Sequence, residues 1–334
     1  MNTDILFRAL SIKRGAGSLL ERGFVAFLAR ELDADLIDEA GNLHFDRRTR
    51  YSNKTLFTAH TDTVHRVDGA NEFTVDGDKV SANGSQLGAD DGAGIAIIAH
   101  MIQSGTPGYY ILFRGEECGG IGSNWLAKND PDMLRQFDRA VAFDRRGTSS
   151  VITHQSGGRC ASQEFAEALS DALNAQGMLY APDDTGVYTD TANFTDIIPE
   201  CTNVSVGYEH EHSKSEWLNL DHLRQLAAAV VAIDWDALPT ERDPSSMGVG
   251  DLPVAMSIRD HEIEAAFLDA FDGEDYALRQ LAAAIGYPDD VDIAMKNFDD
   301  DAFTIPNLID LAEDSLDWSD AINRLADEAL ILTH

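Results

Sequence analysis

Residues 54–59 (KTLFTA) form an apolar, strand-like run that ends directly at His60, Thr61 and Asp62. Three later runs also end at an acidic residue or a histidine: YYILFR (109–114) before Glu116 and Glu117, AVAF (140–143) before Asp144, and TNVSVG (202–207) before residues 208–213. In open α/β sheets, sites form in the crevice outside the carboxyl ends of the strands. The repeated placement therefore predicts four strand ends that share one pocket.

Helical patterns alternate with these strands. A glycine-containing turn, residues 87–91 (LGADD), opens an apolar helix over 92–104, and further helical patterns cover 4–32, 162–176 and 218–235. Strands that alternate with helices of this length favour a sheet that helices cover on both faces. We therefore predict an α/β fold with three layers, α/β/α, around a central mixed, mostly parallel sheet.

The sequence changes character after Pro239. Residues 1–239 hold all the strand-ending motifs and are predicted to form one large domain. Residues 240–257 are rich in Pro, Gly, Ser and Asp, which is typical of a linker. Residues 258–334 carry two helical patterns, and over half of the net charge of −33 lies in residues 241–334. We predict a small, acidic, helical appendage at the C-terminal end.

Composition and charge exclude several classes of partner. A net charge of −33 disfavours binding to nucleic acid phosphates and anionic membranes. The N-terminal residues lack a signal-peptide pattern, and no apolar run approaches the roughly 18 residues of a membrane span. The three scattered cysteines make no disulfide framework, so we expect a cytoplasmic protein. The acidity is as typical of a salt-adapted cytoplasm as of an ordinary acidic soluble protein.

The residue types at the strand ends are those of metal sites. His60 and Asp62 stand two residues apart, so a strand places both side chains on one face. A ligating histidine usually donates its second ring N–H to a carboxylate, so we expect Asp62 to orient His60. Two metals about 3.5 to 4 Å apart need a shared anionic ligand. We choose Asp91 for this bridge, with Asp90 as the alternative; helix capping is the plainer role for an aspartate at this turn.

The adjacent acids Glu116 and Glu117 are predicted to divide two tasks. Their side chains diverge at a strand end, so one can bind a metal while the other reaches the water between two metals. A metal-bound water is acidified toward neutrality, and a neighbouring carboxylate can take its proton and pass it to a leaving amine. We assign Glu116 as this general base and Glu117 as a metal ligand.

Asp144 ends its strand-like run and is a natural terminal ligand. Arg145 and Arg146 follow it directly, and they are either solvated or available to hold a carboxylate of the substrate. For the last ligand, His210 and His212 are again two residues apart, and the residues alone leave this choice open.

In order along the chain, these motifs resemble the five metal-site motifs of the co-catalytic zinc exopeptidases. That superfamily includes leucyl aminopeptidases, peptidase T, glutamate carboxypeptidases and acetylornithine deacetylase. The motifs that carry the resemblance are His60-Thr61-Asp62-Thr63-Val64, Gly88-Ala89-Asp90-Asp91, Glu116-Glu117, Asp144 and His212-Ser213-x-x-Glu216. The resemblance covers residues 5–235 approximately, and residues 189–199 also resemble a segment before the last histidine of the aminopeptidases.

The resemblance implies two divalent metal ions, zinc first and cobalt or manganese as alternatives. The implied ligand sets are His60, Asp91 and Asp144 for one ion, and Asp91, Glu117 and His212 for the other. His212 is preferred over His210 because the family's last ligand precedes a Ser or Thr. Asp62 would then orient His60, and Glu116 would be the general base and acid.

The intervals between the motifs refine the expected fold and substrate. The stretches from His60 to Asp91 and from Asp144 to His212 are too short for an inserted lid domain of about 80 to 100 residues. In the family, Asp at the position of Asp144 goes with aminopeptidases, so we expect an aminopeptidase that acts on short peptides. An N-acyl amino acid deacylase or a carboxypeptidase with the same metal site is the alternative. A non-catalytic binding homologue is less favoured, and homo-oligomerisation stays open.

Overall fold

The computed structural model describes residues 1, 3–49 and 54–245 and contains one large sheet of eight strands. Its four central strands are the four apolar runs of the sequence: β14 (Glu200–Ser205), β9 (Arg139–Arg145), β4 (Thr55–His60) and β8 (Tyr109–Phe113). They are neighbours in this order, and each adjacent pair is parallel. Their carboxyl ends therefore meet at one edge of the sheet.

Shorter strands extend the sheet on both sides. Beyond β8 lie β3 (Leu43–Asp46) and β2 (Leu36–Ile37), and both of these pairings are antiparallel. Beyond β14 lie β10 (Ser150–Ile152), which is antiparallel to β14, and β13 (Ala181–Asp183), which is parallel to β10. The sheet is thus mixed with a parallel centre, as the sequence predicts.

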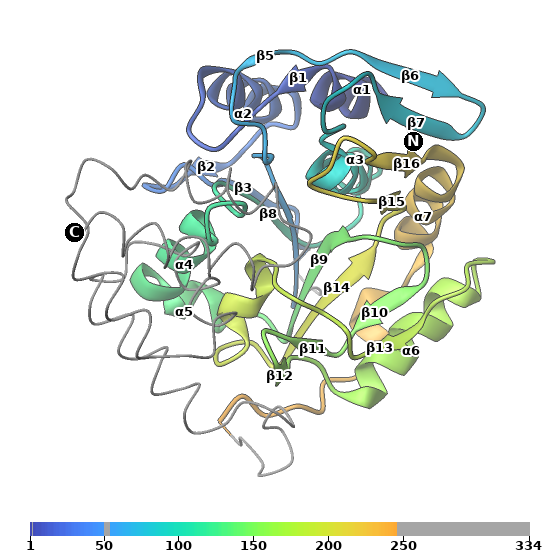
Figure 1. Ribbon diagram of the computed structural model, residues 1–334. Helices are drawn as coiled ribbons and strands as arrows, with labels where there is room; N and C mark the ends of the chain where they lie inside the picture. The colour runs from blue at the N-terminus through green and yellow to red at the C-terminus, as the bar shows by residue number, and fades with distance from the viewer. Residues whose placement is uncertain (2, 50–53, 246–334) are drawn as a thin grey trace, which may run out of the picture. The chain divides into compact units, whose positions relative to one another are not determined.

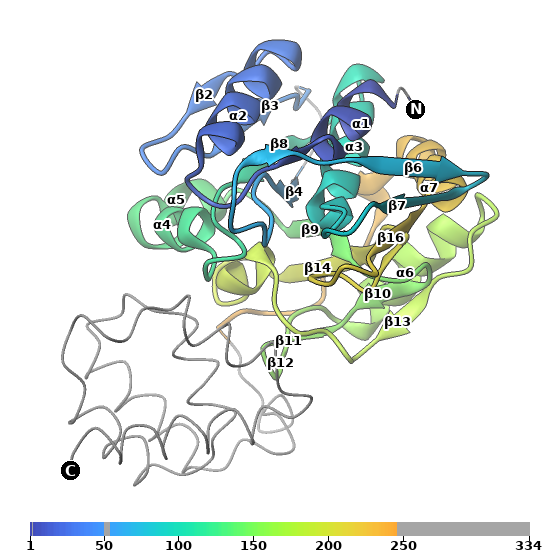
Figure 2. The ribbon, with the colours of Figure 1, turned by 45° about the horizontal axis from the view of Figure 1, so that its top comes forward.

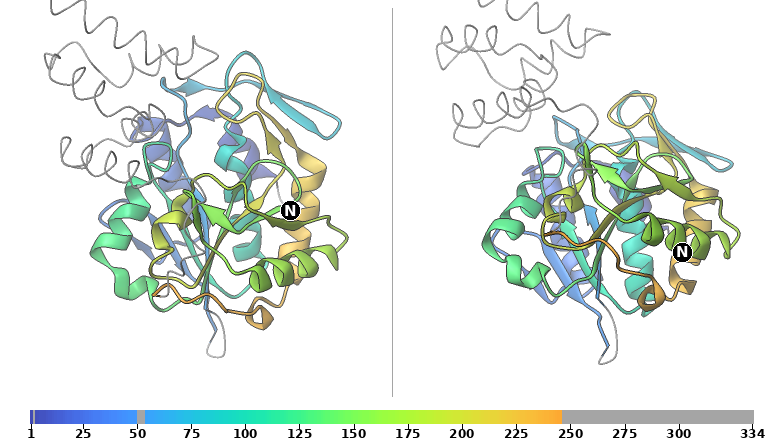
Figure 3. Two further views of the ribbon diagram at one scale, coloured as in Figure 1. Left: turned by 60° about the horizontal axis from the view of Figure 1, so that its bottom comes forward. Right: turned by 90° about the horizontal axis from the view of Figure 1, so that it is seen from below.

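Helices cover both faces of the sheet (Figures 1 and 3). One face carries α3 (Ala89–Gln103), α6 (Gln163–Asn174) and α7 (Leu220–Ala232), and α1 (Asp4–Leu10) packs against α3. The other face carries α4 (Ile121–Asn129), α5 (Pro131–Leu134) and the 3₁₀ helix η1 (Asp190–Phe194). The remaining helical elements are α2 (Leu19–Glu31) and the 3₁₀ helix η2 (Trp235–Ala237). This arrangement confirms the predicted three layers.

The core explains why the central strands read as continuous apolar runs. Every residue of β4 and β14 is buried, because helices cover both faces of a parallel sheet. Phe57 on β4 stacks on Tyr110 and Phe143 of the neighbouring strands, and its ring edge meets Trp235. Helix α3 is buried along most of its length, which accounts for its small and aliphatic residues.

A second, four-stranded antiparallel sheet lies beside the main one. Its order is β15 (Tyr208–Glu209), β16 (Trp217–Asn219), β7 (Lys79–Ala82) and β6 (Phe73–Asp76), and Figure 2 shows β6, β7 and β16 together. The loop between β15 and β16 carries His212. Two small pairings, β1 (Ile12–Lys13) with β5 (Gly69–Ala70) and β11 (His154–Gln155) with β12 (Gly158–Arg159), complete the described strands.

The sequence predicts no inserted lid between His60 and Asp91 or between Asp144 and His212. These two intervals hold only the 73–82 hairpin and other elements of the domain itself.

The first residues of the predicted linker lie on this domain, because the amides of Glu241 and Arg242 donate to Glu200 Oε1 at 2.8 and 3.0 Å. The rest of the linker and the appendage predicted over 258–334 lie outside the described residues. Across 1, 3–49 and 54–245, the structure contains no helix with the length and apolar character that a membrane crossing requires.

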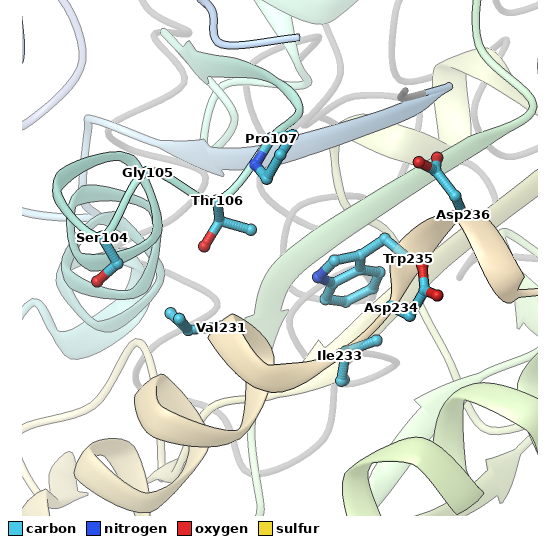
Figure 4. Close-up of a pocket in the computed structure, with 9 residues that line it drawn as sticks. All are labelled: Ser104, Gly105, Thr106, Pro107, Val231, Ile233, Asp234, Trp235 and Asp236. Carbon is cyan, nitrogen blue, oxygen red and sulfur yellow. The ribbon is translucent and has the colours of Figure 1, made fainter. Parts of the chain in front are cut away.

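A hollow lies where α3 and α7 end, lined by residues 104–107, Val231 and residues 233–236 (Figure 4). Helix α3 begins at the carboxyl ends of the strands and runs for 15 residues, so about 20 Å separates its two ends. The hollow is therefore remote from the acids and histidines at the strand ends.

Candidate metal centre

A first cluster of metal-binding side chains lies at the ends of β4 and β9 and at the start of α3. His60 Nε2 is 3.0 Å from Asp90 Oδ1 and 3.5 Å from Asp144 Oδ1. All three residues are buried. One ligand atom from each lies within 4.8 Å of the others, which is the spacing that a shared cation requires.

A second cluster shares Asp90 with the first. His212 Nε2 is 3.2 Å from Asp90 Oδ2 and 3.1 Å from Glu117 Oε2. The two oxygens of one carboxylate thus face two different histidines. The His212 side chain is 54% exposed, whereas Asp90 and Glu117 are almost fully covered, so the second cluster is the one that opens toward solvent.

The bridging position differs from our first choice. Asp90, the predicted alternative, stands between the clusters, and Asp91 does not. The Asp91 carboxylate accepts hydrogen bonds from the amides of His60, at 3.1 Å, and Gly94, at 2.8 Å. The Gly94 bond is of the capping kind that an aspartate makes at a helix start. Asp90 and Asp91 both have non-helical dihedral angles, and these angles turn the two side chains in different directions.

Asp62 has the predicted place beside His60. Asp62 Oδ1 lies 3.5 Å from His60 Nδ1, the ring nitrogen that faces away from the cluster. The same carboxylate accepts hydrogen bonds from three successive amides, those of Gly115, Glu116 and Glu117, at 2.9, 3.2 and 3.2 Å. Asp62 therefore lies next to the imidazole and holds the turn that presents the two glutamates.

Glu116 lies next to the first cluster, with its Oε2 atom 4.0 Å from His60 Nε2. Burial raises the pKa of Glu116 well above its usual range, and the nearby Asp144 and Glu117 raise it further. Burial is also the main cause of the raised pKa values of Glu117 and Asp144. These carboxyl groups therefore need nearby positive charge to ionise fully.

The pKa values of the two histidines are also raised, which for an imidazole favours the charged form. Burial opposes the charged form of His60, but Asp144, Asp62 and Asp90 outweigh it and raise the pKa of this ring well above the usual value. Although the His212 side chain is 54% exposed, partial desolvation of its ring also opposes the charge, and Glu117 and Asp90 outweigh this effect and raise its pKa to about 12. The centre is thus a place where cationic charge is strongly favoured.

Hydroxyl groups hold Asp144 in position. Thr189 donates to Asp144 Oδ2 at 2.6 Å, and the Tyr208 hydroxyl donates to Asp144 Oδ1 at 3.1 Å. Thr189 belongs to the 189–199 segment that the sequence singles out. Next to it, Asp190 is buried, its Oδ1 atom has no hydrogen-bond partner among the described residues, and burial raises its pKa to about 7.

Glu216 holds the turn that carries Asp90. Its two carboxylate oxygens accept four successive amides, those of Leu87, Gly88, Ala89 and Asp90, at 2.7 to 3.1 Å. The sequence motif includes this acid but does not reveal its task. The observed contacts explain why an acid stands four residues after His212.

Sequence reasoning missed Arg14, which is fully buried beneath the centre. Its guanidinium donates to the carbonyl oxygens of Thr61 and Ala9 at 2.8 Å and of Gly88 at 3.1 Å. Burial lowers the pKa of Arg14, while Asp91 and Asp62 are the acids that most favour its charge. A Lys-Arg pair in the sequence indicates a solvated surface, so no sequence signal marked this residue.

The remaining candidates lie outside the two clusters. His210 is exposed and directly follows β15, with a left-handed backbone. Arg145 and Arg146 follow Asp144 at the end of β9 and bind Thr185 and Glu211, respectively.

No family model matches the sequence, and a search of curated proteins finds no match. Solved structures match the fold. The aminopeptidase PepT from Bacillus cereus has a TM-score of 0.55 at 15% identity, over 70% of this chain and 97% of that chain. The aminopeptidase APDkam598 from the archaeon Desulfurococcus kamchatkensis has a TM-score of 0.57 at 15% identity, over 70% of this chain and 94% of that one.

A third match is the TET1 peptidase of Pyrococcus horikoshii, which can assemble into a tetrahedron or a large octahedral shell. Its TM-score is 0.54 at 18% identity, over 69% of this chain and 98% of that chain. Identities this low establish the fold and not the reaction. The described residues have the fold of these aminopeptidases, as the resemblance of the motifs predicts.

Proposed function

We propose that this chain is a metal-dependent exopeptidase, and specifically an aminopeptidase that removes N-terminal residues from short peptides. The observation that carries the proposal is the pair of His and carboxylate clusters joined by Asp90 at the carboxyl edge of the sheet. The aminopeptidases among the structural matches add support through their shared fold.

The chain offers two sets of ligands for divalent metals. The proposed first set is His60, Asp90 and Asp144, and the proposed second set is Asp90, Glu117 and His212. The buried Glu117 Oε1 atom has no hydrogen-bond partner among the described residues, so its lone pairs are free for a cation. Imidazole and carboxylate ligands suit zinc, and they also accommodate cobalt or manganese. These residues therefore fit a pair of divalent ions.

When bound, the metals supply the positive charge that acidifies a water molecule and polarises the scissile carbonyl. The protein's own groups do the rest of the chemistry. Glu116 takes a proton from the attacking water and returns it to the leaving amine nitrogen. Asp62 holds the amides of Gly115, Glu116 and Glu117, so it sets the position from which Glu116 acts.

The decisive experiment replaces Glu116 with Gln, which keeps the shape of the side chain and removes its proton-transfer chemistry. We expect the variant to bind metal as the wild type does and to lose at least about 10²-fold in kcat. The matched control is Glu167→Gln on the exposed face of α6, which should retain full turnover. Full activity of Glu116→Gln with bound metal would contradict the assignment.

A substrate panel separates the aminopeptidase from its alternatives. Aminoacyl anilides, dipeptides with a free or acetylated N-terminus, and N-acyl amino acids would be offered to the metal-loaded protein. Because an aminopeptidase requires a free α-amine, only the unblocked substrates should turn over. Hydrolysis confined to N-acyl amino acids would instead identify a deacylase.

Metal analysis separates an enzyme from a non-catalytic homologue. We expect close to two zinc, cobalt or manganese ions per chain after reconstitution, and loss of hydrolysis after chelation. Well below one ion per chain, with no hydrolysis on adding metal, would favour a binding protein. The shell-forming relative supports homo-oligomerisation as a proposal, which light scattering would test.

A further inference from the structure

Two arginines stand directly beyond Asp144, and the proposed mechanism uses neither. Arg146 is half exposed and forms an ion pair with Glu211 at 3.0 Å. Arg145 has a different environment, because its Nη2 atom donates to the carbonyl and the hydroxyl oxygen of Thr185, both at 3.1 Å. Its Nε atom is buried and has no hydrogen-bond partner among the described residues. The hydrogen bonds of the Arg145 guanidinium thus go to neutral groups.

The acid nearest to this contact is already engaged. Asp183 accepts hydrogen bonds from the amide and hydroxyl of Thr185, at 2.8 and 2.6 Å, and from the Ser150 hydroxyl. The charge of Arg145 contributes to the lowered pKa of Asp183, but within the described part of the chain no carboxylate oxygen lies within ion-pair distance of the guanidinium. Guanidinium groups favour carboxylates because their planar fork matches the two oxygens, so Arg145 keeps capacity for an anion.

One loop connects Arg145 with the candidate metal centre. The loop over residues 184–189 supplies Thr185, which holds Arg145, and Thr189, which holds Asp144. Arg145 is also the residue that follows Asp144 on β9. An extended peptide advances about 3.5 Å per residue, so the one or two residues beyond the scissile bond extend roughly 3.5 to 7 Å from it.

Charge makes this cation important for a peptide substrate. The protein carries a net charge of −33, and four carboxyl groups, those of Asp90, Glu116, Glu117 and Asp144, line the centre. A free C-terminal carboxylate that enters such a field is repelled unless a cation receives it. Of the two arginines that follow Asp144, Arg145 is the one that forms no ion pair within the described residues.

We propose that Arg145 binds the C-terminal carboxylate of a short peptide substrate. This inference rests on the proposed peptidase function and specifies its substrate class as peptides that end one or two residues beyond the scissile bond. The site then prefers dipeptides and tripeptides with a free carboxylate over the same peptides with a blocked C-terminus.

The test compares matched substrates, namely a dipeptide and a tripeptide and the C-terminal amide of each. For the wild type, we expect kcat/KM to favour the free acids by roughly tenfold or more, the size of one charge-assisted hydrogen bond. Arg145→Met should abolish this preference, mainly through a higher KM for the free acids. Arg145→Lys keeps the positive charge but lacks the planar guanidinium that matches two carboxylate oxygens, so it should retain part of the preference for free acids. Arg146→Met is the matched control and should keep the wild-type preference.

Equal kcat/KM for acids and amides in the wild type would overturn the inference while leaving the peptidase function intact. A preference that persists in Arg145→Met, or one that disappears in Arg146→Met, would overturn it too. Failure of the metal-loaded wild type to hydrolyse any of the peptides would instead reject the proposed function, and the inference with it. If Arg145→Met does not fold, the wild-type ratio and Arg145→Lys still decide.

Discussion

At the scale of single residues, Asp90 and Asp91 show how adjacent identical side chains take on different tasks. Asp90 faces both histidines, and Asp91 accepts two backbone amides. The split follows from backbone dihedral angles, which differ between the two residues. One carboxylate is therefore placed for ligand chemistry and the other for holding β4 and α3 together.

This division predicts opposite results for two conservative substitutions. Asp90→Asn removes the shared anionic ligand, so we expect loss of both metals and of hydrolysis. Asp91→Asn leaves the clusters in place but weakens two buried hydrogen bonds, and we expect it to cost about 1 to 3 kcal/mol of unfolding free energy. Elemental analysis and urea unfolding measure the two effects. Loss of metal from Asp91→Asn, with full retention in Asp90→Asn, would restore Asp91 as the bridge.

His65 provides a pH test away from the proposed ligands. Its Nδ1 atom lies 2.8 Å from the Thr63 hydroxyl and its Nε2 atom 3.0 Å from the Gln86 carbonyl oxygen. Burial lowers its pKa from 6.5 to about 4. The folded state therefore binds fewer protons than the unfolded state below pH 6.5, so the stability that neutral His65 contributes is present above this pH and is lost as pH falls toward 4.

The His65→Gln variant isolates this contribution. The amide can still donate to Gln86, but it does not titrate. We expect the stability advantage of the wild type to shrink by about 2 kcal/mol between pH 7.5 and pH 5. Urea unfolding of both proteins at the two pH values measures this difference, and the other titrating groups cancel in the subtraction. A difference that stays constant across this range would show that His65 is not held neutral.

At the scale of elements, the 87–90 turn depends on an acid from a distant hairpin. Glu216, near the start of β16, accepts all four amides of the turn, and this contact ties the His212 loop to the Asp90 turn. Since both proposed clusters need Asp90, the contact sets the geometry of the whole centre.

Glu216→Gln tests this coupling. The amide replaces one acceptor oxygen with a donor that faces backbone N–H groups, so we expect a loss of about 1 to 3 kcal/mol in unfolding free energy. We also expect weaker metal retention, measured by competition with a chelator. Glu167→Gln is again the control, because its side chain is exposed on α6. Metal affinity and stability equal to the wild type would show that the turn holds itself without Glu216.

Some features of the fold and the site could be predicted from the sequence, and others could not. The central strands could be predicted because β4 and β14 are buried on both faces and therefore read as unbroken apolar runs. The place of Asp62 beside His60 could be predicted from their two-residue spacing, although β4 ends at His60 and Asp62 lies just beyond it. Arg14 could not, since its partners are backbone carbonyls that carry no residue signature. The choice between Asp90 and Asp91 depends on dihedral angles that spacing does not encode.

At the scale of the whole molecule, charge is the dominant property of this chain. The sequence holds 58 acidic and 25 basic residues, which gives a net charge of −33. Self-repulsion of this size destabilises a compact state while keeping it soluble. The same field attracts metal cations and the free ammonium group of an aminopeptidase substrate, so it supports the proposed chemistry at a cost in stability.

Salt should therefore stabilise the protein. Raising KCl from 0.1 to 1 M shortens the screening length from about 10 to about 3 Å, which removes most repulsion between exposed carboxylates. If this screening raises the free energy of unfolding by about 2 kcal/mol, Tm should rise by roughly 4 to 8 °C. Thermal unfolding at fixed metal saturation measures the shift in Tm. Sucrose serves as an uncharged control, and it should not produce the steep rise in Tm at low concentration that we expect for KCl. A Tm that is flat or falls with KCl would mean that the acidic residues are already paired or spaced beyond mutual repulsion, and that the acidity has no link to salt.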